Sequence, residues 1–358
     1  MPDPLRPPGR LNPTVGKARK LVGNLLGLAT TGRHRPAANP AVVPPLVLVA
    51  CSGGPDSLAL AAVLAFFARR GEIRAGAVVV DHGLQPGSAD VAARAADQLR
   101  GLGLDPVQVR AVVVADDGDG PESAARTARF GALGEAARDL GARTVLLGHT
   151  LDDQAESVLL GLARGSGTRS LAGIRERRGI YLRPFLALRR TETEEICAAL
   201  GLAPWHDPAN TDPAYLRSRV RHEILPYLEE RLAPGIAANL ARTATILAQD
   251  ADHLDALADA EFTRLAEIVP DEVRLPAASL GELAPALRHR VMARAVVVLG
   301  GRQPSQERLR AAAALLARRG SAGPVQMAGH VHAYRIPRSK AVQQDGAGYG
   351  KLVFRRAP

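Results

Sequence analysis

The stretch LVLVACSGGPDSLALAAVLAFFARRG, which begins at Leu46, constrains the fold of this chain more than any other segment. Its apolar run stops at Cys51, two glycines follow at Gly53 and Gly54, and apolar residues return after Pro55 at helical spacing. Glycines at such a junction allow positive φ angles and let a ligand come close to the backbone. The helix N-terminus beyond them offers unpaired N–H groups and a partial positive charge. The stretch therefore predicts a buried strand and a buried helix joined by a phosphate-binding turn.

Asp56 is an unusual neighbour for such a turn. Its carboxylate can simply cap the helix, but beside phosphates it would repel them unless Mg²⁺ lay between. Lysine occurs only at positions 17, 20, 340 and 351, so residues 21–339 offer no P-loop or Schiff-base lysine, and the GxxxxGK[ST] pattern is absent. We therefore expect a nucleotide pyrophosphate and a metal ion at this turn, bound without a lysine.

Apolar strand-like runs alternate with helical segments from residue 46 onward. Because the strands are continuously apolar, they indicate a parallel sheet covered on both faces, and the right-handed crossover rule gives a doubly wound α/β domain. Thr191-x-x-Glu194 has the form of a capping box at the start of one helix. The predicted strands span residues 46–51, 73–83, 107–114, 144–150 and 180–186, and the predicted helices span 57–70, 88–101, 122–140, 152–164 and 191–201.

The chain divides into three predicted parts. Residues 1–45 form an N-terminal extension that we expect to be partly mobile. Residues 46–225 form the α/β domain, and a proline-rich segment lies near its end. Residues 226–358 form a second, mainly helical domain that ends in a small strand pairing, because leucines recur there at heptad spacing and the last residues alternate with period two.

Charge and cysteine content limit the functional classes. The formal net charge is +10 and the pI is near 10.3, which is typical of a protein that binds a polyanion, although a biased surface composition is the alternative. Cys51 and Cys197 lack CxxC spacing and cannot build a disulfide framework. No apolar run approaches the ~18 residues of a membrane span, and the first residues lack the apolar core of a signal peptide. We expect a cytoplasmic protein without membrane contact.

Polar residues follow two more of the predicted strands. Asp81 and His82 end the second strand, and Gly148 and His149 end the fourth. The carboxyl ends of parallel strands share one edge, so we expect these segments to meet the glycine-rich turn in one crevice. The acidic residues that open the next helix, on one face, are Asp152, Asp153 and Glu156. A structural histidine or a favourable helix-dipole contact would explain any one of these residues, but not their joint placement.

Several segments resemble the signature motifs of the tRNA(Ile)-lysidine synthetase family of PP-loop ATPases. SGGPDS, at residues 52–57, is similar to the SGGxDS loop of PP-loop ATPases in general. The segments that resemble the narrower family, in order over residues 46–228, are DHGLQPGSADVA, ESAARTARFGAL, GHTLDDQAESVLLGLARGSGTRSLAGI, LRPFLALRR and HDPANTDPAYLRSRVRHEILP. Three positions depart from the family pattern, where Gln85 replaces Arg, Phe130 replaces Tyr and Ser218 replaces Asn.

The resemblance implies an enzyme that uses ATP and Mg²⁺ to join free L-lysine to C2 of the wobble cytidine, position 34, of a tRNA(Ile) with a CAU anticodon. An adenylated cytidine is the implied intermediate, and AMP and pyrophosphate are the implied products. A homodimer is a further expectation. The alternatives are another PP-loop tRNA-modifying enzyme of the 2-thiolation type, an ammonia-using synthetase, and a non-catalytic RNA-binding module. Paired cysteines and a glutaminase segment, which the first two alternatives need, are not found in the sequence.

The resemblance also implies roles for individual residues. The implied catalytic residues are Asp56, Arg126, His149 and Glu156. The implied nucleotide contacts are Ser52, Gly53, Gly54, Pro55, Asp56, Ser57, Asp81, His82 and Gly148. The implied metal ligands are Asp56 and Asp153. The implied tRNA or lysine contacts are Asp152, Arg164, Arg169, Arg217 and Arg221.

Overall fold

The protein is described from a computed structural model. The described residues are 12–28, 43–83, 87–113, 121–165, 167–208, 212–318, 322–336 and 350–357. Most of residues 1–45, for which the sequence predicts partial mobility, lie outside them, as does Gln85.

Two compact units make up the chain, residues 1–248 and 249–358. The division falls inside the long helix α10 (Ile236–Leu265). The sequence placed a functional boundary earlier, after residue 225. The assignment of residues 46–225 to catalysis and of 226–358 to tRNA binding stays a prediction.

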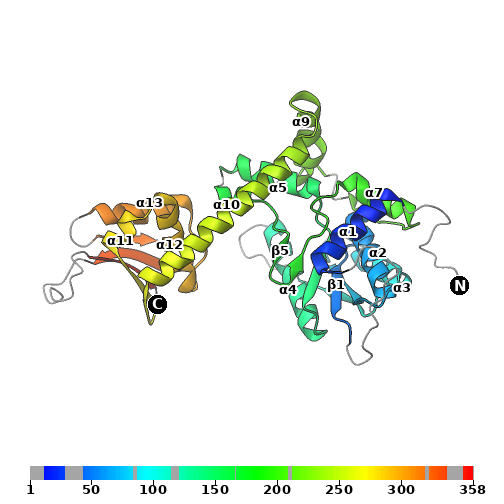
Figure 1. The fold of residues 1–358 in the computed structure, drawn as a ribbon, viewed down its shortest axis with the longest axis horizontal. Coiled ribbons are helices and arrows are strands. Elements are labelled where there is room, and N and C mark those ends of the chain that lie inside the picture. Colours follow the sequence, from blue (N-terminus) through cyan, green and yellow to red (C-terminus); the bar gives the residue numbers. More distant parts are fainter. Residues whose placement is uncertain are drawn as a thin grey trace. The chain divides into compact units, whose positions relative to one another are not determined.

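A six-stranded sheet forms the centre of the first unit, within the described residues (Figure 1). Its order is β3-β2-β1-β4-β6-β5, and all neighbouring strands are parallel except β5 and β6. The strands are β1 (Leu46–Ala50), β2 (Arg74–Asp81), β3 (Val107–Ala111), β4 (Thr144–Leu147), β5 (Arg177–Arg178) and β6 (Tyr181–Leu182). The strand order reverses at β1, between β2 and β4. Ligands of doubly wound sheets bind at such a point, beyond the carboxyl ends of the strands.

The helices of the first unit confirm the predicted alternation. Each of the five helices predicted between residues 57 and 201 begins and ends within two residues of the expected positions. The helices before residue 200 are α1 (Pro13–Leu26), α2 (Pro55–Arg69), α3 (Ser88–Gly101), α4 (Pro121–Asp139), α5 (Leu151–Ala163), α6 (Thr168–Leu171) and α7 (Arg190–Ala199). They are followed by α8 (Leu216–Arg219), the π-helix η2 (Val220–Ile224), α9 (Leu225–Arg231) and α10. None of the helices in the described ranges is long and apolar enough for a bilayer crossing.

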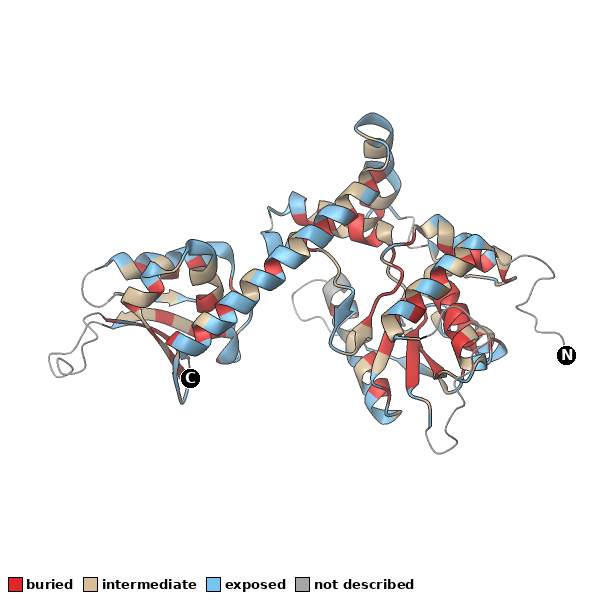
Figure 2. Ribbon diagram, viewed as in Figure 1, coloured by how far each residue is buried: buried red, intermediate tan, exposed pale blue. Residues whose placement is uncertain are grey.

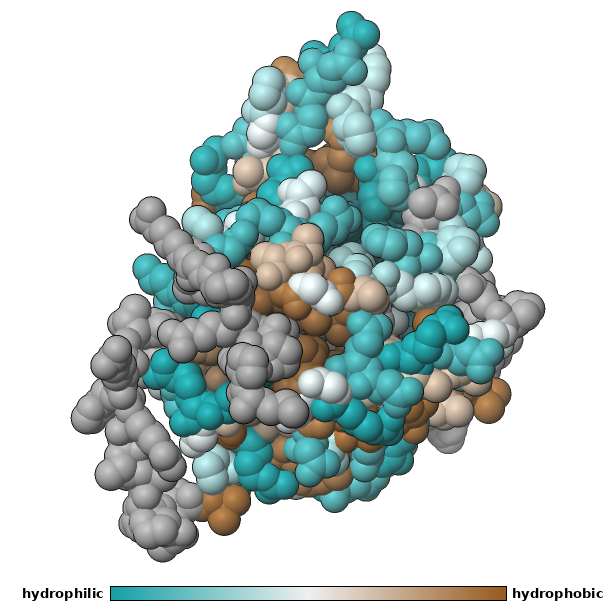
Figure 3. Space-filling view, turned by 90° about the vertical axis from the view of Figure 1, so that its right-hand side faces the viewer, coloured by the Kyte–Doolittle hydropathy of each residue, from teal (hydrophilic) through white to brown (hydrophobic). Residues whose placement is uncertain are grey.

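Alternate residues of β1 build two separate cores, one on each face of the sheet. Val47 and Val49 pack with residues of α1, α2, α3 and α7, whereas Leu46 and Leu48 pack with residues of α4. All five residues of β1 are buried (Figure 2). The surface view shows mainly hydrophilic side chains outside this interior (Figure 3). The sheet is therefore covered on both faces, and β1 is buried up to the point where the glycine-rich turn begins.

A five-stranded antiparallel sheet forms the second unit, together with the C-terminal half of α10 and three further α-helices of the described residues. The strand order is β7-β8-β11-β10-β9. The strands are β7 (Glu267–Val269), β8 (Glu272–Pro276), β9 (Ala322–Gln326), β10 (Val331–Ile336) and β11 (Lys351–Arg356), and the helices are α11 (Ala277–Glu282), α12 (Pro285–Val298) and α13 (Gln306–Ala314), with a short 3₁₀ turn, Leu315–Ala317. The expected strand pairing at the end of the chain is present, but it belongs to a larger sheet than predicted. The sequence missed β7 and β8 because both are short and carry acidic residues.

Candidate active site

The SGGPDS segment forms the turn between β1 and α2. Gly53 has a φ angle of 83°, which favours glycine, and a Cβ at this position would lie 3.2 Å from the Cβ of Ala95. Gly54 is the N-cap of α2 and makes no side-chain capping bond, and Pro55 occupies the first turn. The first turn of α2 therefore presents N–H groups that no capping side chain occupies, as an anion site requires.

Hydrogen bonds within the turn fix its shape. The Ser57 hydroxyl accepts a bond from the Ser52 N–H at 3.2 Å and donates to the Gly54 carbonyl at 3.1 Å. The two serine hydroxyls lie 3.3 Å apart. The N–H of Trp205 donates to the Gly53 carbonyl at 2.9 Å, so a segment far along the chain holds the turn from outside. The turn is thus preorganised by its own side chains and by the 203–208 segment.

Gly148 has a packing role beside this turn. A Cβ at Gly148 would lie 3.0 Å from the backbone carbonyl of Asp56 and from the Ser57 nitrogen. Only glycine lets the carboxyl end of β4 approach the first turn of α2 so closely. This approach brings the GHT segment that follows β4 next to the SGGPDS turn, as the sequence predicted.

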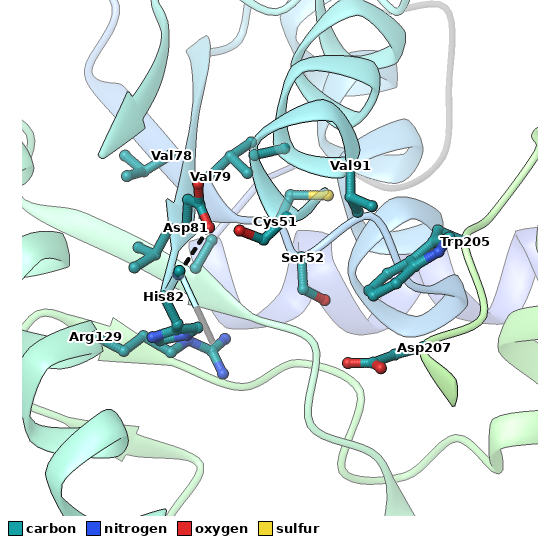
Figure 4. Close-up of a pocket in the computed structure, with 15 residues that line it drawn as sticks. Cys51, Ser52, Val78, Val79, Asp81, His82, Val91, Arg129, Trp205 and Asp207 are labelled. Atoms are coloured by element: carbon teal, nitrogen blue, oxygen red, sulfur yellow. Dashed lines mark hydrogen bonds between the residues drawn. The ribbon is translucent and has the colours of Figure 1, made fainter. Parts of the chain in front are cut away.

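A pocket of about 200 Å³ lies beyond the carboxyl ends of β1 and β2 (Figure 4). Its apolar wall comes from β1, β2 and α3, and its polar groups include the predicted residues Ser52, Asp81 and His82. Arg129, Trp205 and Asp207 also line it, and the sequence analysis gave none of these three a role. An apolar slot with a few polar groups next to an anion-binding turn has the composition of a nucleoside site.

The two histidines of the crevice are neutral near pH 7. Burial and the charge of Arg129 lower the pKa of His82 despite the nearby Asp81. Burial lowers the pKa of His149 to about 3, and the charge of Asp153 does not offset it. Among the described residues, the Nδ1 atom of each histidine is buried without a hydrogen-bond partner. Both rings are therefore suited to hydrogen bonding, and neither supplies positive charge to a phosphate.

Three acidic and three arginine side chains meet next to the turn, and we call them the acid–arginine cluster. Its members are Asp56 of α2, Asp153 and Glu156 of α5, Arg190 of α7, Arg217 of α8 and Arg221 of η2. The Glu156 side chain has no exposed surface and lies 2.9 Å from Arg217 Nε and 2.7 Å from Arg221 Nε. Arg190 reaches all three acids, at 3.6 Å from Asp56, 3.1 Å from Asp153 and 3.5 Å from Glu156.

The acids of the cluster differ in how well their charge is balanced. Burial raises the pKa of Asp56 to about 6, and the hydrogen bond from Thr193 and the charge of Arg190 offset only part of this effect. Burial would also raise the pKa of Asp153, but Arg190 and Arg217 outweigh it and hold this pKa below its usual value. Asp153 Oδ2 in addition accepts bonds from the N–H of Thr150, at 2.8 Å, and from its hydroxyl, at 3.0 Å. Asp56 is therefore the less compensated carboxylate.

Magnesium fits this donor set at Asp56, with Asp153 as a second carboxylate. Mg²⁺ binds proteins through one or two carboxylates and completes its shell with phosphate oxygens and water. Among the described residues, no three His, Cys, Asp or Glu side chains converge as a closed metal cage. The less compensated charge of Asp56 beside an anion-binding turn suits an ion shared with a polyphosphate.

Other predicted residues lie elsewhere or are already engaged. Asp152 holds the start of α7, because its Oδ2 accepts from the Arg190 N–H at 2.7 Å and its Oδ1 lies 3.0 Å from Arg189 Nε. Arg126 is exposed and its guanidinium lies 5.2 Å from the centre of the Phe130 ring. Arg164 and Arg169 are exposed near the junction of α5 and α6. The structure brings none of these three arginines into the cluster.

Two further residues near Asp56 were missed in the sequence. Arg190 and Thr193 lie on α7, and the Thr193 hydroxyl donates to Asp56 Oδ1. The segment LRPFLALRR resembled a family motif that ends in arginine, and this was the one available signal for Arg190. Nothing local to Thr193 indicates its contact with α2.

Comparison with known proteins agrees with this geometry. A family profile described as a PP-loop domain matches residues 34–228. The tRNA(Ile)-lysidine synthase of Thermobifida fusca is 56% identical over 255 residues, which cover 71% of this chain and 78% of the relative. The enzyme of the same name from Leifsonia xyli is 52% identical over 300 residues, 83% of this chain and 90% of the relative. That of Nocardia farcinica is 43% identical over 323 residues, 90% of this chain and 94% of the relative.

A solved structure supports the fold alone. The U34-tRNA thiolase NcsA of Methanococcus maripaludis, determined with its 4Fe-4S cluster, aligns with a TM-score of 0.50 at 20% identity. The alignment covers 66% of this chain and 80% of that chain. With an intact SGGPDS turn, a nucleoside-sized pocket beside it and relatives of one name along most of its length, the chain belongs to the tRNA(Ile)-lysidine synthase family of PP-loop proteins.

Proposed function

We propose that this protein ligates free L-lysine to C2 of the wobble cytidine of tRNA(Ile) with a CAU anticodon, in an ATP-dependent reaction. One structural observation carries the chemistry, namely that the nucleoside pocket shares Ser52 with the SGGPDS turn. A nucleotide in this pocket would have its phosphates at the turn and next to the acids of the cluster. Relatives that are 43–56% identical over most of the chain carry the substrate assignment.

The first step is adenylation of the tRNA base. The C2 oxygen of cytidine forms a bond to the α-phosphorus of ATP, and the bond from that phosphorus to the pyrophosphate oxygen breaks. The N–H groups in the first turn of α2, with the hydroxyl of Ser52, hold the leaving pyrophosphate. Mg²⁺, held by Asp56 and Asp153, supplies charge neutralisation on the polyphosphate when bound. Trp205 and the apolar wall from β1 and β2 hold the adenosine.

Attack by lysine is the second step. The ε-amine forms a bond to C2 of the adenylated cytidine, and AMP leaves with the former C2 oxygen. The amine must lose a proton to attack, and a carboxylate of the acid–arginine cluster is placed to take it. Glu156, fully enclosed by Arg217 and Arg221, orients these arginines instead.

Binding of the tRNA rests on the positive charge of the chain, +10 overall. Arg164 and Arg169 are exposed close to the gap between α5 and α6 and are candidates for contacts with the phosphate backbone. The reacting cytidine lies in an anticodon loop, where bases can leave the stack and enter a pocket. Residues 226–358 are the proposed tRNA-binding part. Homodimeric assembly and a cytoplasmic location stay predictions.

A 2-thiolation enzyme is the second candidate, and the cysteines disfavour it. Cys51 and Cys197 are both buried, and burial raises the pKa of each thiol, that of Cys197 to about 12. Sulfur transfer needs reactive, accessible thiolates or a cluster that thiolates bind. A non-catalytic RNA-binding module is disfavoured by the partly buried Asp56 and the buried Glu156, whose charges cost stability in a protein that only binds RNA.

Nucleoside analysis of tRNA(Ile) after incubation with the protein, ATP and lysine tests the proposal. We expect lysidine in the tRNA and one AMP released per modified base. The variant D56A should bind the tRNA and adenylate nothing. Release of ADP in place of AMP would refute the pyrophosphatase chemistry, and turnover that depends on a sulfur donor or ammonia in place of lysine would move the protein to a sister family.

A further inference from the structure

Arg129 is the arginine in the wall of the nucleoside pocket. It projects from α4 and lines the pocket together with Ser52 and His82. Figure 4 shows Arg129 and His82 on one side of the pocket and Trp205 and Asp207 on the other. The charge of Arg129 is also felt by Cys51 at the start of the turn and by His149 on the far side of the crevice. Arg129 is therefore a cation in the wall of the pocket, which Ser52 of the turn also lines.

The guanidinium of Arg129 has no partner in the part of the chain that the structure describes. No hydrogen bond or ion pair joins it to another described residue, although it is only partly exposed. Arg190, Arg217 and Arg221, by contrast, each contact two or more carboxylate oxygens. A half-buried guanidinium without an anion is costly, and the cost is removed when an anion binds.

The surroundings of Arg129 are positive. Burial lowers its pKa, and Arg126 lowers it further. Burial and Arg126 similarly lower the pKa of Arg183 to about 10, and Arg129 contributes to that shift. The charge of Asp153 acts on Arg129 in the opposite direction, but Asp153 is already bound to other arginines. Among the described residues, Arg129 therefore has no carboxylate partner of its own.

We propose that Arg129 binds the phosphoryl group adjacent to the nucleoside, the α-phosphoryl group of ATP and of the adenylated intermediate. The assignment rests on the proposed function for the identity of the intermediate, but its nucleotide-binding part does not. The SGGPDS turn accounts for the terminal pyrophosphate and the pocket for the adenosine, and Arg129 lines this pocket together with Ser52, the residue that the pocket shares with the turn. The planar guanidinium offers two parallel N–H donors to two phosphoryl oxygens, which a lysine does not.

Arg129 thereby stabilises the charge that develops in the reaction. As the cytidine oxygen bonds to the α-phosphorus and pyrophosphate departs, negative charge builds on the non-bridging α-oxygens, where Arg129 donates. When the lysine amine attacks C2, the same phosphoryl group leaves in AMP and stays bound to Arg129. The guanidinium remains protonated throughout and forms no covalent bond.

Paired titrations with AMP and adenosine test the assignment. AMP and adenosine differ only in the α-phosphoryl group, so the ratio of their dissociation constants isolates that contact from the shape of the pocket. In the full-length variant R129Q, we expect the affinity for AMP to fall about 10- to 100-fold, the loss of one charge-assisted contact, with adenosine unchanged. R138Q, which removes an exposed arginine from the same helix, should leave both affinities as in the wild type. R129K should fall between the wild type and R129Q for AMP.

Several outcomes would overturn the assignment. If R129Q lost equal affinity for AMP and for adenosine, Arg129 would only shape the nucleoside pocket and would not contact the phosphoryl group. Unchanged AMP binding in R129Q, or an AMP-specific loss in R126Q instead, would place the phosphoryl group elsewhere. If R129Q does not fold, R129K decides, because wild-type AMP affinity in that variant contradicts a paired contact. Absence of lysidine formation by the wild type would refute the proposed function but would leave the AMP result standing.

Discussion

Two buried glutamates, one in each unit, make similar contacts in different settings. Glu156 of the first unit contacts Arg217, Arg221 and Arg190, and its side chain is 0% exposed. Glu272 of the second unit pairs with Arg274 and with Arg355, and its side chain is 7% exposed. Both are carboxylates enclosed by guanidinium groups. A buried glutamate paired with arginines therefore does not by itself distinguish a functional site from a structural ion pair.

The surroundings of the two glutamates do separate them. Arg274 is two residues from Glu272, and Arg355 lies directly opposite on β11, so this group is local to one sheet. The arginines around Glu156 come from α7 and from the consecutive helices α8 and η2, all distant in sequence from α5, and two more acids share them. Three acids held close together next to an anion-binding turn repel one another and lower the stability of the fold. Arrangements that lower stability in this way are typical of functional sites. This contrast predicts different outcomes for the same substitution at the two sites.

The largest expected effect is that of E156Q. An amide in place of the carboxylate removes the nearer of the two carboxylate partners of Arg217 and of Arg221 and leaves Asp153 as the other, and removal of one partner from a buried ion pair costs about 3–5 kcal/mol. Adenylation should fall by at least about 100-fold, because the arginines next to the turn lose their positions. Thermal unfolding and AMP release with tRNA, lysine and ATP measure the two effects.

The matched control is E272Q. Arg274 and Arg355 are 36% and 54% exposed, so solvent compensates for much of the lost pair and the cost should be about 1 kcal/mol. Activity per folded molecule should remain that of the wild type. If E272Q loses activity as E156Q does, the distinction between the two glutamates is wrong.

D56N should uncouple stability from activity. Asp56 has a pKa raised from 3.8 to about 6 by burial, so the folded state holds its proton more tightly than the unfolded state does. For a raised carboxyl pKa, the contribution to stability falls as pH rises from about 4 to 6 and stays low above that range. D56N removes this penalty and should be about 1–3 kcal/mol more stable than the wild type at pH 7, at 1.4 kcal/mol per pKa unit with allowance for partial exposure.

The same variant should adenylate no tRNA, since it lacks the anionic ligand that a metal ion needs. The stability difference between D56N and the wild type, followed by thermal unfolding from pH 4 to 8, should appear between pH 4 and 6. A D56N protein that is less stable at pH 7 would show that the Arg190 contact outweighs burial.

The sequence predicted the parts of this site that follow directly from strand ends. The alternation of apolar runs gave the sheet, and the carboxyl ends of parallel strands brought Asp81, Gly148 and Asp153 to the SGGPDS turn. Residues that reach the site from loops or helices far along the chain, and not from a strand end, were not predictable in this way. Trp205 arrives through one backbone hydrogen bond to Gly53, within a proline-rich segment that carries no periodic pattern. Tertiary contacts, which no local pattern encodes, decide such positions.

Helix boundaries show the same limit on a smaller scale. The predicted capping box at Thr191 and Glu194 is wrong, because α7 begins one residue earlier and the Glu192 carboxylate accepts from the Arg189 N–H at 2.8 Å. That start is fixed by Asp152, which accepts from the Arg190 N–H. A contact between two helices thus overrides the local capping signal. Phe130, which departs from the family pattern, packs edge-on against Tyr181 with ring centres 5.0 Å apart, so here the aromatic ring serves packing.

A smaller effect is expected from T193V, which tests how the hydrogen bond from Thr193 affects the pKa of Asp56. Thr193 is fully buried and its hydroxyl donates to Asp56. Valine keeps the volume but removes the donor, so the charged form of Asp56 loses its hydrogen bond and its pKa should rise further above 6. We expect a stability loss of about 1–2 kcal/mol at pH 7 and a pH profile of adenylation that shifts to higher pH. T193S, which keeps the hydroxyl, should retain the wild-type profile, and an unchanged profile in T193V would contradict the contact.

The smallest effect is expected at the surface, from E195A. Glu195 of α7 accepts bonds from Asn12 Nδ2 at 2.9 Å and from the Thr14 hydroxyl at 2.8 Å, which join α7 to α1. These bonds lower the pKa of Glu195, so its contribution is present above the usual value of 4.5 and disappears as pH falls. Because the carboxylate is exposed, water replaces the lost bonds, and the change in melting temperature should be close to the measurement error.

E192A is the comparison variant and should reduce stability and adenylation more than E195A does. Glu192 binds both Lys17 and the Arg189 N–H and so holds the start of the helix that carries Arg190. If E195A and E192A reduced adenylation equally, the capping of α7 by Glu192 would not be what positions Arg190. The contact between α1 and α7 would then hold Arg190 next to the acids of the cluster.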